Sequence, residues 1–189
     1  MNAAASQAAP FLRRSVAWLI DATVLSLLAT VFTWRWIAPA ANASVASMSA
    51  LEDLATHKLV DALLAGTPPA GMLQALLHDP AMLLAAARVQ DALWLLLVPW
   101  TLAYAVLAFA WHVAGDLSPW RGSPGKRWLG LRVETLDGGT PTARQAMLRE
   151  AGSALSWLTL NLGHVLALMP PRRQSLHDRL AGTQVRAAR

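Results

Sequence analysis

Two long apolar segments constrain this chain more than any other feature of its sequence. Residues 15–34 contain a single ionisable side chain, Asp21, and residues 92–114 contain no Asp, Glu, Lys or Arg. An apolar helix of about 20 residues is about 30 Å long, which matches the hydrocarbon core of a bilayer. Helices of soluble proteins are rarely apolar on every face for such a length. The segments therefore predict an integral membrane protein with at least two membrane-spanning helices.

The composition agrees with a membrane protein. Apolar residues make up 55% of the 189 residues and charged residues only 14%, whereas a typical soluble domain has about 25% charged residues. The chain has no cysteine, which excludes disulfides, zinc–thiolate sites and thiol catalysis. Its net charge is +5, and its Lys and Arg residues flank the apolar segments. This placement predicts anionic lipid headgroups, and no nucleic acid, as partners of the basic residues.

The two spans are expected at about 15–36 and 92–114. A third apolar segment, 151–169, also contains Ser, Thr, Asn, Gly and His residues. It could cross the membrane, enter it and return, or lie in the interface. Residues 1–9 are small and polar, which predicts a disordered amino terminus. Residues 10–189 are then expected to form one membrane domain.

The connection between the two spans is expected to form extra helices outside the membrane. Pro39 discourages continuation of the first helix, and the Ala, Ser and Asn residues of 40–50 resemble a linker. Residues 51–65 have one apolar helical face, and Gly66-Thr-Pro-Pro then marks a break. The sequence therefore predicts outer amphipathic helices within 40–90. The helix that follows should run without interruption into the second span.

A short β-structure is expected after the second span. Residues 129–135 alternate between apolar and polar, and Asp137-Gly138-Gly139 follows them, which is typical of a hairpin turn. The predicted fold is therefore an all-α integral membrane protein with two to three transmembrane helices plus a short cytoplasmic β-hairpin.

The distribution of basic residues predicts the orientation. Residues before the first span, the 115–150 loop and the tail after 169 are rich in arginine, whereas the 37–90 connection has only Lys58 and Arg88. Cytoplasmic loops carry an excess of Lys and Arg. The amino terminus, the 115–150 loop and the tail are therefore expected in the cytoplasm. Three full crossings would place the tail outside, so the third segment is expected not to cross.

Arg14 and Asp21 form the first candidate site. They are seven residues apart, close to two helical turns, and so share one face of the first helix. Asp21 lies about two turns inside the apolar segment, where an ionised carboxylate costs about 2.5–3.5 kcal/mol. It therefore needs a partner, a water-filled cavity or a proton. A proton or cation site and a structural pair that joins helices are both compatible with this pattern.

Asp178 and the histidines are further candidates. Asp178 lies between His177 and Arg179, a pattern usually found in a solvated turn. His112 and His164 lie in apolar segments and could pair with Asp21. The five histidines show no metal-ligand spacing, and no Ser-His-Asp arrangement has a recognisable nucleophile setting. The sequence therefore predicts no enzyme activity, no cofactor and no metal.

Three fragments together resemble the RDD family of prokaryotic membrane proteins: RRSVAWLID (13–21), SPGKRWLGLRVETLDGG (123–139) and RRQSLHDRLAGTQV (172–185). The family is named for one arginine and two aspartates, which by motif match correspond to Arg14, Asp21 and Asp178. The resemblance covers about 10–36 and 92–186. The long 37–90 connection departs from the family pattern.

The resemblance implies a polar Arg14–Asp21–Asp178 cluster near the cytoplasmic side of a multi-pass protein of the bacterial inner membrane. It also implies a transport component, either for monovalent cation/proton exchange or for an undefined ligand. The alternative is a membrane adaptor or assembly factor in which the Arg/Asp cluster is structural. Because three apolar segments are few for a complete pathway, a transporter would need a homo-oligomer or other membrane proteins as partners.

Overall fold

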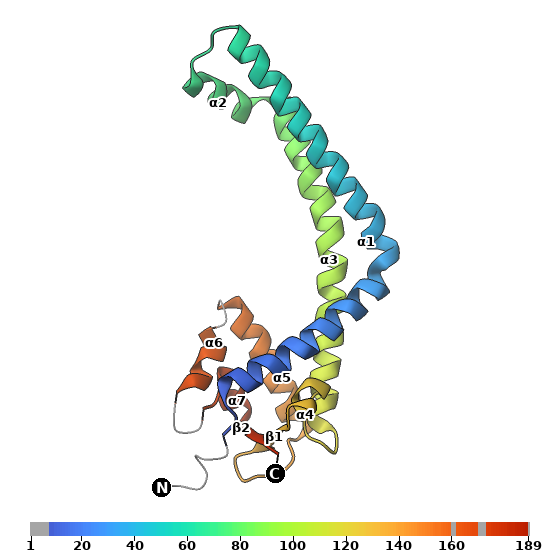
Figure 1. The fold of residues 1–189 in the computed structure, drawn as a ribbon, viewed down its shortest axis with the longest axis vertical. Coiled ribbons are helices and arrows are strands. Elements are labelled where there is room, and N and C mark those ends of the chain that lie inside the picture. Colours follow the sequence, from blue (N-terminus) through green and yellow to red (C-terminus); the bar gives the residue numbers. More distant parts are fainter. Residues whose placement is uncertain (1–7, 160–161, 170–172, 189) are drawn as a thin grey trace. The chain divides into compact units, whose positions relative to one another are not determined.

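The computed structural model describes residues 8–159, 162–169 and 173–188, without the side chains of residues 157 and 158. The chain forms two compact units. One unit consists of Leu28–Ala103, and the other joins the residues up to Leu27 to those from Tyr104 onward. Helices α1 and α3 contribute to both units (Figure 1).

Helices α1 (Phe11–Leu64) and α3 (Pro80–Leu117) are the two helices long and apolar enough to cross a membrane among the described residues. In their most apolar 18-residue stretches, only 28% and 11% of the residues are buried. A core helix of a soluble protein would bury most of such a stretch. Both helices instead expose large apolar side chains, among them Leu27, Phe32, Leu95 and Leu102. The prediction of two candidate membrane-spanning helices is confirmed.

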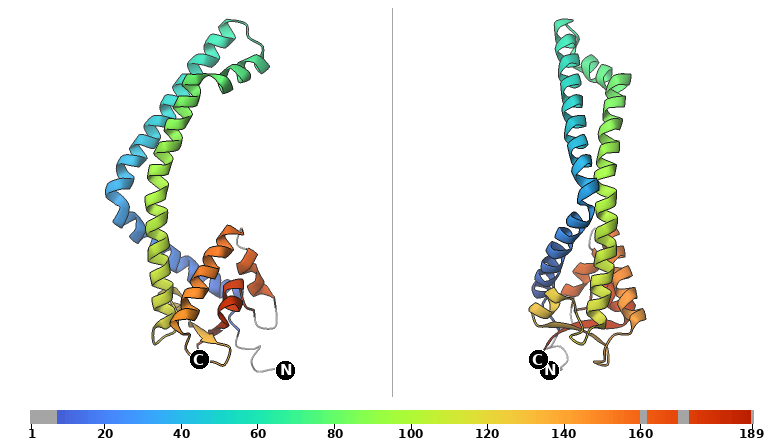
Figure 2. Two further views of the ribbon diagram at one scale, coloured as in Figure 1. Left: turned by 180° about the vertical axis from the view of Figure 1, so that it is seen from behind. Right: turned by 90° about the vertical axis from the view of Figure 1, so that its right-hand side faces the viewer.

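In the Leu28–Ala103 unit, the later part of α1 and the first part of α3 lie side by side (Figures 1 and 2). Trp100 donates a hydrogen bond to Thr30 Oγ1 at 3.0 Å. The expected end of the first helix near Pro39 was wrong, because α1 continues through Pro39 and through the expected linker. Alanine is the best helix former, and small residues let two helices approach closely. The Ala and Ser residues of this stretch accordingly include buried ones, Ala40 and Ser44.

The break after α1 occurs where the sequence predicts it. Gly66 has φ 69°, a left-handed conformation that favours glycine, and α2 (Pro69–His78) begins with proline in its first turn. Asp79 then accepts hydrogen bonds from the backbone N–H groups of Ala81 and Met82 at the start of α3. Its carboxylate also pairs with Lys58 of α1. The polar residues of this region therefore stabilise the connection between α1, α2 and α3.

A two-stranded antiparallel sheet lies in the other unit, and its second strand comes from the tail. Strand β1 (Leu131–Thr135) pairs with β2 (Thr183–Ala187), with Val133 opposite Val185. The Asp137-Gly138-Gly139 turn forms as expected, with Thr135 and Gly139 joined by a backbone hydrogen bond. However, Pro141 and α5 (Ala143–Leu158) follow the turn. The hairpin is therefore not local, because a helix occupies the place of its second strand.

The beginning of the described chain also joins this sheet. Ala8 forms a β-bridge with Arg186, and the Ala9 N–H donates to the Val185 carbonyl at 3.1 Å. Ala9 is buried with Ala17, Leu131, Val133 and Val185 in a small apolar core. The expectation of disorder over 1–9 was therefore wrong for residues 8 and 9, while residues 1–7 lie outside the described residues.

Short helices complete this unit: α4 (Pro124–Trp128), α6 (Leu162–Val165), the 3-10 turn η2 (Leu166–Leu168) and α7 (Leu176–Ala181). The third apolar segment is divided between the end of α5, α6 and η2. Each described piece is shorter than the roughly 17 residues that a span needs. Helix α7 has a capping box between Ser175 and Asp178, and it ends at Gly182 with φ 64°.

Candidate functional site

A cavity of about 340 Å³ lies in the unit that contains both ends of the described chain. Regular spacing on two helices places its wall residues on one face of each helix. Helix α1 contributes Arg14, Trp18 and Asp21 to the wall, and α3 contributes residues four apart, Tyr104, Ala108, His112 and Asp116. Polar groups from the later elements complete it: Lys126, Arg149, Glu150, Ser153, His164, Ser175 and His177.

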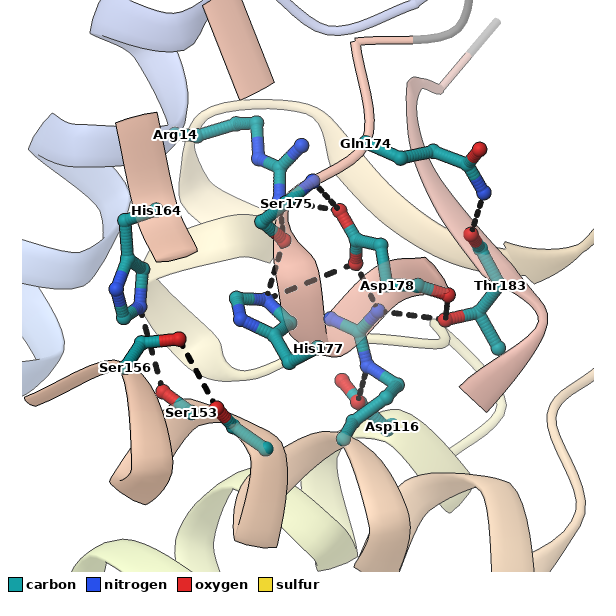
Figure 3. Close-up of polar contacts among 12 residues, drawn as sticks. Arg14, Asp116, Ser153, Ser156, His164, Gln174, Ser175, His177, Asp178 and Thr183 are labelled. Atoms are coloured by element: carbon teal, nitrogen blue, oxygen red, sulfur yellow. Dashed lines mark hydrogen bonds and ion pairs between the residues drawn. The ribbon is translucent and has the colours of Figure 1, made fainter. Parts of the chain in front are cut away.

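Five charged side chains beside this cavity form a continuous ion-pair network. Arg14 Nη2 contacts Asp178 Oδ2 at 2.6 Å, and Arg149 Nη1 contacts the other oxygen of the same carboxylate. Arg149 Nε also lies 2.8 Å from Asp116 Oδ2, and Lys126 Nζ lies 3.1 Å from Asp116 Oδ1. The network therefore joins α1, α7, α5, α3 and α4. Figure 3 shows its Arg14, Asp178 and Asp116 side chains.

The centre of this network is buried. The side chains of Arg149 and Asp178 are 5% and 0% exposed. Burial opposes ionisation of Asp178, but the guanidinium groups of Arg14 and Arg149 hold the pKa of Asp178 well below its usual value. Burial likewise opposes the charge on Arg149, while Asp116 and Asp178 raise the pKa of its guanidinium. Asp178 and Arg149 are therefore both charged across the physiological pH range.

Asp21 forms a separate set of hydrogen bonds. It is 1% exposed and accepts from Trp111 Nε1 at 3.0 Å, from the Gly125 N–H at 2.9 Å and from the Ser123 hydroxyl. All these donors are neutral. The polar residues Arg14, Asp21 and Asp178 of the expected cluster are therefore divided between two sets of contacts. Arg14 and Asp178 form an ion pair, whereas Asp21 is held by α3 and α4 on another part of the cavity wall.

A comparison with protein-family models tests the resemblance carried by the fragments at 13–21, 123–139 and 172–185. The RDD family model matches residues 8–182, nearly the whole chain. The chain belongs to the RDD family. No curated protein and no solved structure matches it. The RDD match spans α1 to α7, so the helices that form the cavity belong to the family pattern.

In this RDD protein, Asp178 does not lie in a solvated turn. It is the third residue of α7, where its carboxylate also accepts the Ser175 N–H at 3.1 Å. The sequence contains the signal for this cap, a Ser followed three residues later by an acid, with Gly182 after the helix. The solvated turn suggested by the flanking charges is not formed, because α7 directs the carboxylate toward Arg14 and Arg149.

His164 and His177 lie side by side in this unit, with ring centroids 5.1 Å apart (Figure 3). His177 Nε2 lies 2.9 Å from Ser175 Oγ, and His164 Nε2 lies 3.4 Å from Ser153 Oγ. Burial lowers the pKa of His177 well below its usual value, although Asp178 opposes that shift. His177 is therefore neutral. His112 is on the cavity wall, and neither it nor His164 hydrogen-bonds Asp21 among the described residues.

Over the described part of the chain, no group of three or more His, Asp and Glu side chains is arranged to hold a metal ion. A Ser-His-Asp relay is not formed by Ser175, His177 and Asp178 either. Both Ser175 Oγ and Asp178 Oδ1 approach the same ring nitrogen, His177 Nε2. A catalytic relay needs the acid on the opposite nitrogen from the nucleophile.

Glu150 is a cavity residue that the sequence analysis did not identify. It is half-buried on α5, and among the described residues it takes part in none of the ion pairs that hold Asp116 and Asp178. Burial raises the pKa of Glu150 to about 7, and Asp116 adds to this effect while Lys126 and Arg149 oppose it. The carboxyl group therefore exchanges its proton near neutral pH.

Asp116 and Arg149 were also missed. Asp116 follows the second apolar segment, and α3 continues to Leu117 and keeps Asp116 buried. Arg149 was counted among the basic residues of a cytoplasmic loop, yet it is 4% exposed. The available signal was weak: α5 is amphipathic, and one arginine falls on the face that also carries Ala146 and Ser153.

Proposed function

We propose that this RDD protein is a transport component of the bacterial inner membrane that exchanges a monovalent cation for a proton. The observation that carries the proposal is a cavity whose wall contains a carboxyl group outside the ion-pair network and able to change charge near pH 7. The formal charges of the other charged groups on and beside the wall balance, because Arg14, Lys126 and Arg149 are offset by Asp21, Asp116 and the network residue Asp178. Ionisation of one further carboxyl group then creates a site for one positive charge.

A structural role for the Arg/Asp residues is the second candidate. It is favoured by the saturation of Asp21 with three donors and of Asp178 with two arginines. In an adaptor or assembly factor, these contacts would hold the helices while the basic surface binds anionic lipid or another membrane protein. Two candidate spans are few for a transport pathway, so the transport proposal includes a homo-oligomer. Neither function requires catalysis, and we expect no enzyme activity.

Replacing Asp21 by asparagine separates these two functions. Asparagine has the same shape, its Oδ1 can accept from Trp111 and Gly125, and its amide can donate to a reoriented Ser123 hydroxyl. The fold should therefore persist. The negative charge that offsets the network is lost, so a cation should no longer enter. We expect pH-coupled Na⁺ or K⁺ flux into proteoliposomes, followed with an internal pH dye, to fall to the level of protein-free liposomes.

The control for this experiment is Asp53→Asn, which changes an exposed aspartate on the same helix and should leave flux unchanged. Full flux in Asp21→Asn would contradict the role of this carboxylate in exchange. A wild-type protein that produces no cation-coupled pH change with either ion would instead favour the adaptor.

The sheet leads to a prediction about topology. Strands β1 and β2 and residue 8 are hydrogen-bonded to one another, and such a sheet cannot have a bilayer between its strands. The amino terminus, the loop after α3 and the tail should therefore share one side. Because cytoplasmic segments carry an excess of arginine and lysine, we expect that side to be the cytoplasm. The segment from α5 to η2 would then enter the membrane and return, or lie in the interface.

Because the chain lacks cysteine, single cysteines at Thr140 and Ala188 can be labelled cleanly. Both should react only from the cytoplasmic side, and labelling from opposite sides would exclude this arrangement.

A further inference from the structure

The chemical character of the cavity suggests which class of cation it accepts. Its volume of about 340 Å³ is that of roughly ten water molecules and falls within the range of small-molecule pockets. Aromatic side chains from two helices, Phe11 and Trp18 of α1 and Tyr104 of α3, form part of the wall, together with the apolar Ala108 and Leu131. A bare alkali-metal ion needs neither this volume nor apolar surface.

The oxygen atoms on the wall are also poorly suited to an alkali-metal ion, which needs several oxygen ligands at once. The carboxylate of Asp116 on the wall binds Arg149 and Lys126, and Asp178 beside the wall binds Arg14 and Arg149. Both oxygens of Asp21 accept hydrogen bonds. Among the described residues, Glu150 is the cavity carboxylate that takes part in none of these ion pairs and hydrogen bonds. One carboxylate beside aromatic and apolar surface is suited to an organic cation, which needs one counter-charge and an apolar contact.

We infer that the cavity binds a small organic ammonium ion in exchange for the proton of Glu150. This inference rests on the proposed cation/proton exchange and names its substrate class and its proton carrier. The exchange is balanced in charge: the protonated Glu150 carboxyl group releases one H⁺ to water, and the resulting carboxylate binds one ammonium ion. The net charge of the cavity is the same before and after.

The groups around Glu150 define how the exchange depends on pH. Lys126 of α4 and Arg149 of α5 favour its ionised form, whereas burial and Asp116 of α3 oppose it. Its pKa of about 7 is the result of these effects. The other titratable groups on the cavity wall are Arg14 and Asp21 of α1, Tyr104 and His112 of α3, His164 of α6 and His177 of α7. Asp21 is held by hydrogen bonds from Trp111, Ser123 and Gly125, and Glu150 is the group whose charge changes.

Isothermal titration calorimetry on the full-length protein in lipid nanodiscs tests the inference, with benzyltrimethylammonium chloride as one probe and NaCl as the other. Because the ionised fraction of a group with a pKa near 7 changes about tenfold between pH 6 and pH 8, benzyltrimethylammonium should bind about tenfold more tightly at pH 8. At pH 6 its binding should release close to one proton, which is measured by comparing buffers with different ionisation enthalpies. At the same concentration, NaCl should bind more weakly and release fewer protons.

Glu150→Gln should abolish both the pH dependence and the proton release, and Glu150→Asp should retain them. Glu52→Gln, at an exposed position of α1, is the matched control and should behave as the wild type. Proton release by NaCl that equals the release by benzyltrimethylammonium at the same concentration would overturn the inference, as would ammonium binding that is unchanged in Glu150→Gln. Binding and flux are measured separately. Absence of Na⁺ or K⁺ flux in the wild type would therefore argue against the proposed exchange, whereas ammonium binding would still test the site.

Discussion

Replacing Arg149 by methionine is expected to lower the free energy of unfolding by about 3–5 kcal/mol, because two buried carboxylates each lose one of their two cationic partners. Arg149 contacts Asp116, Asp178 and the Thr183 hydroxyl, and its side chain is 5% exposed. Methionine fills a similar volume, so the loss is electrostatic and does not come from packing. Thermal unfolding in detergent, followed by circular dichroism, measures the change. Arg144→Met is the control, since Arg144 is exposed on the same helix and its loss should have little effect.

The same network has a predictable response to acid. The pKa of Asp178 is held well below its usual value of 3.8 in the folded protein. A depressed carboxyl pKa contributes stability that is complete above the unfolded pKa and is lost as the pH falls toward the folded one. The wild type should therefore lose stability below about pH 4, and Arg149→Met should show a smaller acid-dependent loss. Equal stability of Arg149→Met and Arg144→Met at pH 7 would show that the network contributes little.

The sequence predicted the parts of this fold that depend on local composition. The apolar runs of α1 and α3, the break at Gly66 and the helix starting near Asp79 each follow from a few neighbouring residues. Pro39 was misleading, because one missing hydrogen bond is outweighed where Ala40 and Ser44 pack in a helix interface. The strand at 131–135 was recognised, but its partner lies some 50 residues away, and no local pattern identifies such a partner.

The candidate site was predictable only in part, because most of its contacts join residues that are distant in the sequence. The contact between Arg14 and Asp178 was expected from the family resemblance, and the structure shows it. The partners of Asp21 were not expected, since a hydroxyl and a backbone N–H carry no charge signal in the sequence. Glu150 and Arg149 are consecutive charged residues in an amphipathic helix, a pattern that usually faces water. Only the packing of α5 against α7 distinguishes them from solvated charges.

Gly125 makes the closest backbone approach at the site, and its replacement by alanine is expected to destabilise the protein by about 3 kcal/mol. A Cβ atom there would lie 2.3 Å from the Ala17 carbonyl oxygen and 2.9 Å from the Asp21 carboxylate. The carbonyl belongs to the backbone of α1 and cannot rotate away. Helix α4 must therefore move from α1, which breaks the hydrogen bond from the Gly125 N–H to Asp21.

The matched control for Gly125→Ala is Gly122→Ala, three residues earlier in the same segment. A Cβ atom at Gly122 would lie 3.2 Å from Lys126 Cβ and 3.4 Å from Lys126 Cδ, so a shift of a few tenths of an ångström accommodates it. Gly122→Ala should lower the free energy of unfolding by less than about 1 kcal/mol. Both variants are compared with the wild type by thermal unfolding in detergent and by cation flux in proteoliposomes. Gly125→Ala should lose stability and flux together, because the same amide donor positions Asp21. Wild-type stability and flux in Gly125→Ala would show that α4 does not hold Asp21 against α1.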